Sequence, residues 1–337
     1  MDGASGISEE VLVADVGGTN CRLALGKVVG GNFALSRRKV YATGEQGDLA
    51  DVVRDFLGAD GRPTYAAFAV AGPVDGDTIA LTNAQWRFSL AAMEHTFGFR
   101  RAIAVNDLVA QAEAAIRLTP ADIAMIGDQA LPARARTAII GVGTGLGLAS
   151  VSYSGGTATI VPTEGGHSGF APFDTLDVEV MEQWLPETGR VVAEHVVSGP
   201  GLVRLHNTLR TLRNQRPEPG LDGREIVRRA FELEDGPCLE TVHRFSLALA
   251  SVCANFALVQ GAEAIILVGD IVNSLLPELR SDAFRARFEQ YGPRRGFLSG
   301  VPIGVATGRD LGLIGAYHHL QRALQAGERK QPISHAV

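Results

Sequence analysis

The chain has 337 residues, of which 46% are hydrophobic and 20% charged, a composition that argues against a disordered protein and predicts about two globular domains of roughly 150 residues each. Its formal net charge is −6 and its basic residues are scattered, so nucleic acid is not an expected partner. The three cysteines, Cys21, Cys238 and Cys253, lie far apart without a C-x-x-C pair, which argues against a disulfide framework and a cysteine zinc site.

The N-terminal segment is polar. Its first ten residues, MDGASGISEE, show no signal-peptide pattern. No apolar run along the chain approaches the roughly 20 residues that are needed to cross a bilayer. We therefore expect a cytoplasmic protein with no membrane partner.

The first part of the chain alternates between strand-like and helix-like patterns. Leucine, valine and phenylalanine recur at helical spacing over 49–57, and apolar residues do so again over 108–116. The predicted strands are 11–16, 21–26, 39–42, 65–71, 78–82 and 102–105. This alternation predicts an α/β domain.

A second block of the same kind begins near residue 138. The run 137–143 is a predicted strand that ends in glycines, and 147–153 is its return. Glycine-rich turns between two strands thus occur twice, at 17–19 and at 143–145. The repetition predicts a duplicated α/β unit.

Later segments are more helical. Apolar steps of three and four predict one long buried helix over 238–260. The run 264–269 is apolar throughout, as is typical of a central strand in a parallel sheet. A closing helix is predicted over 310–325, and the Pro-, Gly- and charge-rich stretch 213–223 is predicted to be a loop.

The first glycine turn, in the stretch "DVGGTNCR", gathers hydrogen-bond donors. Backbone N–H groups at Gly17 and Gly18 can face an anion without interference from a Cβ. Thr19 adds a hydroxyl, Asn20 an amide and Arg22 a guanidinium that suits phosphate. A plain β-hairpin would also place glycine here, but the combination favours phosphate binding.

Asp15 ends the strand that precedes this turn. A carboxylate cannot bind phosphate directly, so it points to Mg²⁺ held through water. The P-loop pattern is absent because no lysine follows the glycines, and G-x-G-x-x-G fails at Leu148 and Ser150. The sequence therefore predicts neither a P-loop nor a dinucleotide-binding site.

Further polar residues lie in otherwise apolar stretches. Asn106 and Asp107 follow a predicted strand and begin a helix, so Asp107 is either an N-cap or a functional carboxylate at the carboxyl edge of a sheet. Glu164 and His167 flank two glycines, which suggests that something approaches closely there. Glu194 is either a solvated charge on a strand or part of the same site.

Asn83, just after the predicted strand 78–82, is either a turn residue or a further member of this group. Together these side chains provide three carboxylates, two amides and an imidazole. Vicinal hydroxyls of a sugar pair well with carboxylates and amides. The chemistry implied is a sugar beside a nucleotide phosphate.

Seven segments together carry a resemblance to a known family. They are "VADVGGTNCRLAL", "AGPVDGDTIALTNAQWRFS", "AVNDLVAQ", "GVGTGLGLA", "EGGHSGFAP", "EHVVSGPGLVRL" and "GRDLGLIGA". By these segments, and by their order, the chain resembles the bacterial ATP-dependent glucokinases of the hexokinase-like superfamily, outside the ROK branch, from about residue 12 to about residue 320.

The resemblance implies an α/β, duplicated actin-like (ribonuclease H-like) ATPase fold, in two domains with a cleft between them. The smaller domain is expected to comprise 1–110 and about 310–326, with the first phosphate hairpin. The larger domain, 111–309, would carry the second hairpin and most sugar ligands, and 327–337 would be a flexible tail.

The resemblance also implies roles for individual residues. Asp107 matches the catalytic base, and Asp15 the position associated with metal-bound water and Mg²⁺. The sugar-binding positions are Asn83, Asn106, Asp107, Glu164, His167 and Glu194. The ATP-binding positions are Asp15, Gly17, Gly18, Thr19, Asn20, Gly143, Thr144, Gly145 and Gly269.

Some positions differ from the family pattern. Asp270 stands where a second glycine is usual, and Ser168-Gly169 follows His167 where a larger residue is expected. The cysteine-rich zinc motif and the DNA-binding helix pair of sugar-responsive repressors are not matched, which argues against a repressor.

The implied activity is transfer of the γ-phosphate of ATP to the 6-hydroxyl of glucose by a homodimer. A kinase for mannose or fructose, and a non-catalytic sugar sensor on the same fold, are the alternatives. The intact Asp107 argues against the sensor. ATP is the expected donor, although the sequence does not distinguish it from a polyphosphate.

Overall fold

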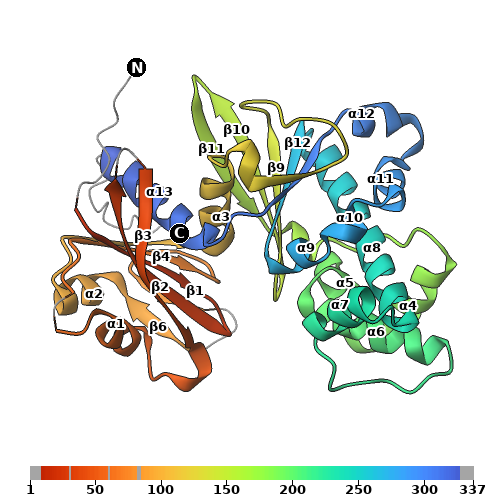
Figure 1. Ribbon diagram of the computed structural model, residues 1–337, viewed down its shortest axis with the longest axis horizontal. Coiled ribbons are helices and arrows are strands. Elements are labelled where there is room, and N and C mark those ends of the chain that lie inside the picture. The colour runs from red at the N-terminus through yellow and green to blue at the C-terminus, as the bar shows by residue number, and fades with distance from the viewer. Residues whose placement is uncertain (1–8, 30–31, 60, 82–84, 327–337) are drawn as a thin grey trace, which may run out of the picture. The chain divides into compact units, whose positions relative to one another are not determined.

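The computed structural model describes residues 9–29, 32–59, 61–81 and 85–326, and the chain divides into two compact units (Figure 1). The first comprises Met1–Arg117 and Arg309–Val337, and the second Leu118–Gly308. The expected boundary at residues 110 and 111 falls inside helix α3 (Asp107–Ala115). The whole of α3 belongs to the first unit, because it packs along α13 (Leu311–Gln325). The predicted tail and Asn83 lie outside the described residues.

The first unit is built on a five-stranded sheet in the order β3-β2-β1-β4-β7. Strand β1 pairs antiparallel with β2 and parallel with β4, and β4 pairs parallel with β7. The two parallel strands therefore end at the same edge as β1. The strands are β1 (Val11–Val16), β2 (Asn20–Val29), β3 (Asn32–Ala42), β4 (Tyr65–Val70) and β7 (Arg101–Asn106).

Smaller elements complete the first unit. Helix α1 begins at its cap Asp48, whose side chain accepts from the Asp51 N–H at 2.8 Å. It buries an apolar stripe that includes Val52 and Phe56 in the core. The elements are α1 (Leu49–Leu57), β5 (Thr78–Ala80), β6 (Arg87–Ser89) and α2 (Leu90–Phe97), with β5 and β6 paired in a sheet of their own.

The second unit repeats this plan. Its sheet has the order β11-β10-β9-β12-β13-β8, again an antiparallel hairpin followed by parallel strands, with β8 antiparallel at the far edge. The expected duplication and the central parallel strand β12 are confirmed. The strands are β8 (Ile123–Ile126), β9 (Thr137–Val142), β10 (Leu146–Ser154), β11 (Thr157–Thr163), β12 (Ala264–Val268) and β13 (Ile303–Ala306).

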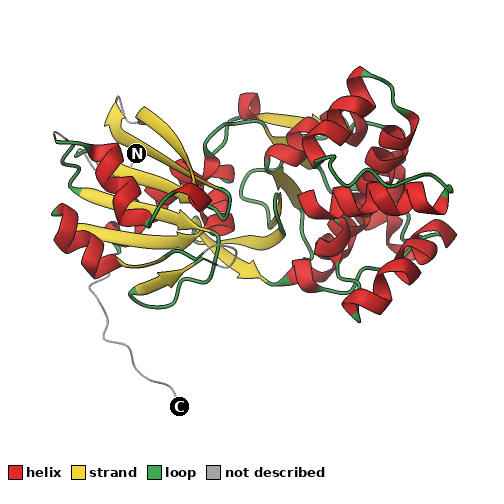
Figure 2. Cartoon of the chain, turned by 90° about the horizontal axis from the view of Figure 1, so that it is seen from below, coloured by secondary structure: helices red, strands yellow, loops and turns green. Residues whose placement is uncertain are grey.

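Helices make up most of the rest of the second unit (Figure 2). The long ones pack on one another around α8. The helices are α4 (Thr175–Thr188), α5 (Ala193–Val196), α6 (Gly199–Leu212), α7 (Gly223–Glu232), α8 (Gly236–Gln260), α9 (Asp270–Ser274), α10 (Leu276–Leu279), α11 (Asp282–Glu289) and α12 (Arg295–Ser299).

Helix α8 corrects one expectation. By length and composition it could cross a membrane, so the expectation that no apolar segment approaches that length was wrong. The sequence conceals it because small polar residues such as Ser246 and Ser251 interrupt the apolar run without adding charge. Within the structure 67% of its most apolar window is buried, as in the core helix of a globular domain.

Two further local expectations differ from the structure in detail. Residues 39–42 form a strand as predicted, but they are only the end of the longer β3, whose exposed residues Arg37, Arg38 and Lys39 hide the rest of the strand pattern. Glu194, which one of its two interpretations put on a strand, lies in the short helix α5. A four-residue helix is too short to leave a periodic signal in the sequence.

The burial of α8 predicts that its inner face stabilises the second unit. Phe245 is fully buried in the core, so Phe245→Ala should lower the free energy of unfolding by about 3–5 kcal/mol. Val259, on the same helix, is 80% exposed, and Val259→Ala should change it by less than about 0.5 kcal/mol. Chemical denaturation of both variants checks this, and equal effects would contradict the assignment of α8 as a core helix.

Candidate active site

The first glycine turn is a tight hairpin between β1 and β2. The Gly17 N–H donates to the Asn20 carbonyl at 3.0 Å. Thr43 fixes the turn from the side, because its N–H donates to the Thr19 carbonyl at 2.9 Å and its hydroxyl to the Gly17 carbonyl at 2.9 Å. The turn is therefore a β-hairpin, which is the plainer of the two interpretations of the sequence, and Thr43 holds it in one conformation.

Asp15 lies at the end of β1 beside this turn. Arg22 Nη1 lies 3.2 Å from Asp15 Oδ2, so the guanidinium that the sequence suggested for phosphate pairs with this carboxylate. Helix α13 passes close by, since a Cβ on Gly312 would lie 2.8 Å from the Asp15 Cγ. Glycine at 312 is what gives the carboxylate room.

Asn106 and Asp107 lie where β7 ends and α3 begins. Asn106, not Asp107, is the N-cap: its Oδ1 accepts from the N–H groups of Leu108 at 3.1 Å and Val109 at 3.3 Å. Its Nδ2 donates to the Gly72 carbonyl at 3.3 Å. Because Asn106 caps the helix, the Asp107 carboxylate is not needed for capping.

The Asp107 carboxyl group is a weaker acid than an ordinary aspartate. Burial, and secondly the negative charge of Asp15, raise its pKa to about 6. The Leu108 N–H, which donates to Asp107 Oδ1 at 2.9 Å, opposes this shift. Two carboxylates thus lie close enough in the first unit to influence each other, and one of them is poised near neutral pH.

The second glycine turn joins β9 to β10. The Gly143 N–H donates to the Gly145 carbonyl at 2.9 Å, and the Gly199 N–H donates to the Gly143 carbonyl at 2.8 Å. On the far side, Glu194 Oε2 accepts from the Leu146 N–H at 2.8 Å. The segment around α5 and the start of α6 therefore holds the turn at both ends.

His167 ends the 3₁₀ turn Gly165–His167 (η3) that follows β11, and Glu164 is the residue immediately before it. Their side chains are 92% and 61% exposed, and His167 Nε2 lies 3.9 Å from Glu164 Oε2. Gly166 lies directly against the second glycine turn, since a Cβ there would overlap the Leu146 carbonyl. The close approach that the sequence suggested for these glycines is confirmed, and its partner is backbone.

Backbone hydrogen bonds bring this turn alongside α5. The Ala193 N–H donates to the Ser168 carbonyl at 2.9 Å, and the Phe170 N–H donates to the Val191 carbonyl at 3.0 Å. Gly169 and Val192 form an isolated β-bridge between them. The segments that carry His167 and Glu194 therefore run side by side.

Gly269 lies between β12 and α9 with φ at 118°, a conformation that favours glycine. A Cβ there would overlap the carbonyl of Val142, the residue before the second glycine turn. Asn273 Nδ2 donates to the carbonyls of Gly269 and Ala306, both at 3.0 Å. Asp270 is the first residue of α9 and does not have a positive φ, so its backbone does not require a second glycine.

The comparisons with known proteins bear on this arrangement. A family model described as Glucokinase matches residues 12–323. The chain is 35% identical to a glucokinase of Tolumonas auensis over 320 residues, which covers 94% of this chain and 99% of the relative.

The chain belongs to the glucokinase family. A crystal structure of a glucokinase from an Antarctic psychrotroph matches with a TM-score of 0.79 and 29% identity, over 93% of this chain and 99% of that one. A ROK family glucokinase from Streptomyces griseus, solved with glucose and AMPPNP, matches with a TM-score of 0.63 over 93% of this chain and 99% of that one, but at 20% identity it bears on the fold alone. The expected duplicated actin-like fold is confirmed.

The structure divides the predicted site residues of this glucokinase-family chain between the units. Asn106 and Asp107 lie in the first unit with Asp15 and the turn Gly17, Gly18, Thr19 and Asn20. Glu164, His167 and Glu194 lie in the second unit with Gly143, Thr144, Gly145 and Gly269. Within each unit the described members are brought together.

Two contributing positions carried little sequence signal. The Leu146 backbone is bonded by Glu194 and approached by Gly166, but an apolar residue beginning a strand gives no indication of this. Gly312, beside Asp15, lies in the stretch "GRDLGLIGA", where the motif alone could have drawn attention to it.

A metal would have to be held by few protein groups. Among residues 9–29, 32–59, 61–81 and 85–326, no group of three or more His, Cys, Asp and Glu side chains is placed to hold a metal ion. Mg²⁺ bound with a nucleotide commonly uses one or two carboxylates, with waters and phosphates as the other ligands. Asp15, whose charge also acts on Asp107, fits that mode.

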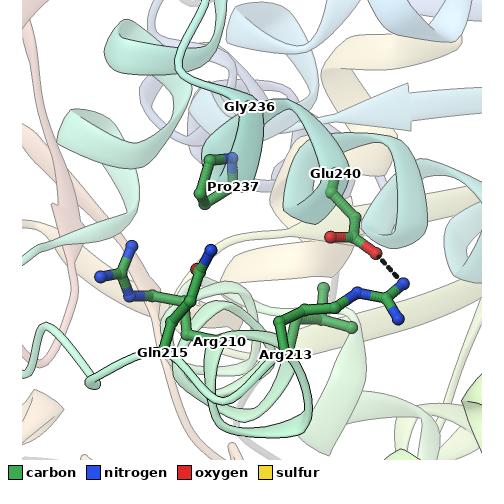
Figure 3. Close-up of a pocket in the computed structure, with 7 residues that line it drawn as sticks. Arg210, Arg213, Gln215, Gly236, Pro237 and Glu240 are labelled. Carbon is green, nitrogen blue, oxygen red and sulfur yellow. Dashed lines mark hydrogen bonds and ion pairs between the residues drawn. The ribbon is translucent and has the colours of Figure 1, made fainter.

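A separate pocket lies between the end of α6 and the start of α8 (Figure 3). Its charged groups are already paired: Arg213 Nη2 donates to Glu240 Oε1 at 2.7 Å, and Arg210 Nε donates to the Arg216 carbonyl at 2.7 Å. None of the predicted site residues lines it. This pocket is therefore not the candidate active site.

The conformation of Gly269 generates a stability prediction. Gly269→Ala forces an alanine to φ 118° and against the Val142 carbonyl, so it should cost at least about 1–3 kcal/mol in the free energy of unfolding. Gly296→Ala in the same unit meets nothing within 4 Å and should be neutral or slightly stabilising. Thermal denaturation measures both variants. Equal melting temperatures would contradict the argument that Gly269 is needed for its backbone conformation.

Proposed function

We propose that this chain transfers the γ-phosphoryl group of ATP to the 6-hydroxyl of glucose, giving glucose 6-phosphate and ADP. Membership of the glucokinase family supports the substrates and the reaction. The observation that carries the mechanism is the Asp107 carboxylate, which burial and Asp15 hold at a pKa of about 6.

Asp107 acts as the general base. Its carboxylate accepts the hydrogen bond of the 6-hydroxyl, orients the attacking oxygen and takes the proton as the bond to phosphorus forms. A pKa near 6 leaves the group ionised at neutral pH while making it a stronger base than an ordinary aspartate. Asn106 supports this role by capping α3 in its place.

The glucose ring is held by side chains that accept from its hydroxyl groups or donate to them. Asn106, Glu164, His167 and Glu194 are the ligands among the described residues, and Asn83 is a further one outside them. Fixing several hydroxyls presents the 6-hydroxyl at one distance from the phosphate, which accounts for much of the rate in such reactions.

The two glycine turns bind the phosphates. Their backbone N–H groups, together with the Thr19 hydroxyl, the Asn20 amide and Thr144, stabilise the charge that moves onto the leaving phosphate. Gly269 lies next to the second turn and contributes on the adenosine side. Mg²⁺, held by Asp15 through water, would neutralise phosphate charge when bound.

The cytoplasmic location and the homodimer expected from the sequence stay predictions. Size-exclusion chromatography with light scattering would test the second of them.

Removal of the base should separate binding from turnover. Asp107→Asn keeps the size of the side chain but cannot accept the proton, so kcat should fall by about 10²–10⁴-fold while glucose binding stays within a few-fold. A coupled assay with Mg-ATP, and calorimetry with glucose, measure the two quantities. Asp128→Asn, at an exposed position away from the site residues, is the matched control. Normal turnover in Asp107→Asn would end the assignment.

The raised pKa of Asp107 predicts a pH dependence. A general base works only when ionised, so protonation below a pKa of about 6 removes activity. We expect kcat/KM for glucose to rise about tenfold per pH unit up to about pH 6 and then to level off. Re-assay at neutral pH after exposure to acid separates titration from unfolding. A reversible limb centred near pH 4 would show that Asp107 is an ordinary carboxylate.

A further inference from the structure

We propose that Glu194 couples glucose binding to the second glycine turn, Gly143–Gly145, so that Gly145 on the nucleotide side also determines the affinity for the sugar. This inference rests on the proposed function, because it takes Glu194 as a sugar ligand and the turn as a phosphate site. The inference adds a contact between Glu194 and the turn, which neither sugar binding by Glu194 nor phosphate binding by the turn requires.

The first observation is the hydrogen bond from the Leu146 N–H to Glu194 Oε2, at 2.8 Å. A bond from a backbone N–H to an ionised carboxylate is stronger than one between neutral groups. A carboxylate has two oxygens and about four acceptor sites. Glu194 can therefore hold the turn through one oxygen and accept from a sugar hydroxyl through the other.

The second observation is the space that Gly145 leaves. A Cβ at this position would lie 2.6 Å from Glu194 Oε2 and 3.4 Å from its Cδ. The carboxylate is thus seated directly over Gly145, where no other residue type would allow it to lie. Because the obstructed atoms are at the end of a flexible side chain, an alanine here would displace the carboxylate without breaking the fold.

The third observation is that the backbone on both sides is fixed. The Ser198 hydroxyl donates to the Glu194 carbonyl at 2.8 Å, and the Gly199 N–H donates to the Gly143 carbonyl at 2.8 Å. Gly166, beside His167, packs on the Leu146 carbonyl. The sugar-side segments therefore contact both ends of the turn, and a change at Glu194 is passed directly to the Leu146 N–H.

The consequence is a reciprocal effect between the two substrates. Glucose that binds Glu194 restrains the carboxylate, which restrains the turn in the form that receives phosphate. Nucleotide that orders the turn in the same way keeps the carboxylate in place for glucose. Thermodynamic linkage requires the two effects on affinity to be equal.

The test compares two glycines of one turn. Gly145→Ala displaces Glu194, whereas a Cβ on Gly143 meets nothing within 4 Å. Calorimetry with glucose, in the absence of nucleotide, should show Gly145→Ala binding about tenfold more weakly than wild type and Gly143→Ala within about twofold. Equal glucose affinities in the two variants would overturn the proposal.

The second arm measures the nucleotide side without sugar. Glu194→Ala should weaken ADP binding in the absence of glucose by about tenfold, and Glu194→Gln should recover most of it because an amide oxygen can accept from the Leu146 N–H. A Glu194 that binds only sugar would leave ADP affinity unchanged in Glu194→Ala, and that result would overturn the coupling.

A double variant completes the cycle. If Gly145 acts through Glu194, adding Gly145→Ala to Glu194→Ala should cause no further loss of glucose affinity, while additive losses would show independent effects. Circular dichroism and melting of each variant confirm folding. Failure of wild type to phosphorylate glucose would overturn the proposed function, whereas the ADP arm would still report on the contact between Glu194 and the turn.

Discussion

The first unit depends on keeping the carboxylate of Asp107 partly buried at the start of a helix without using it as the cap. Asn106 makes this possible by satisfying the first N–H groups of α3. The helix itself is held by α13, where Gly315 allows the Ala110 carbonyl to approach the α13 backbone. Buried Glu113 binds Arg117 and Arg322, each at 2.8 Å, and secures the other end of the contact.

The second unit meets a different constraint, the close approach of backbone to backbone. Gly166 packs on Leu146 and Gly269 on Val142, and these two partners flank the second glycine turn. Where backbone packs directly on backbone, a small displacement of one segment moves the other, because no flexible side chain lies between them. The turn is consequently shaped by residues from three parts of the sequence, and Glu194 adds a charged contact to these steric ones.

Much of this could be predicted from the sequence where the signal was strong and local. The apolar run of β12, the long periodicity of α8 and the two glycine turns were placed correctly. The residue that caps α3 was not resolved, because Asn106 and Asp107 both favour N-caps and only the geometry selects one. The strand interpretation of Glu194 fails because tertiary contacts, and not periodicity, make α5 helical.

The partners of the close approaches at Leu146 could not have been predicted. They join Leu146 to residues 166 and 194 through its backbone carbonyl and N–H, which every residue possesses. Glycine in the sequence indicates that something lies near, but it does not identify what. The motif "GRDLGLIGA" likewise identifies no partners, and only the structure shows that Gly312 lies against Asp15 and Gly315 against α3.

The position of α13 in the chain has a consequence for biosynthesis. This helix completes the first unit, yet it is made from residues 311–325, after the whole of the second unit has been translated. The second unit is continuous in sequence and can fold while it emerges from the ribosome. The first unit is complete only after residues 311–325 have been translated, so a nascent chain that stops short of α13 has both carboxylates but lacks the helix that packs beside Asp15 and along α3.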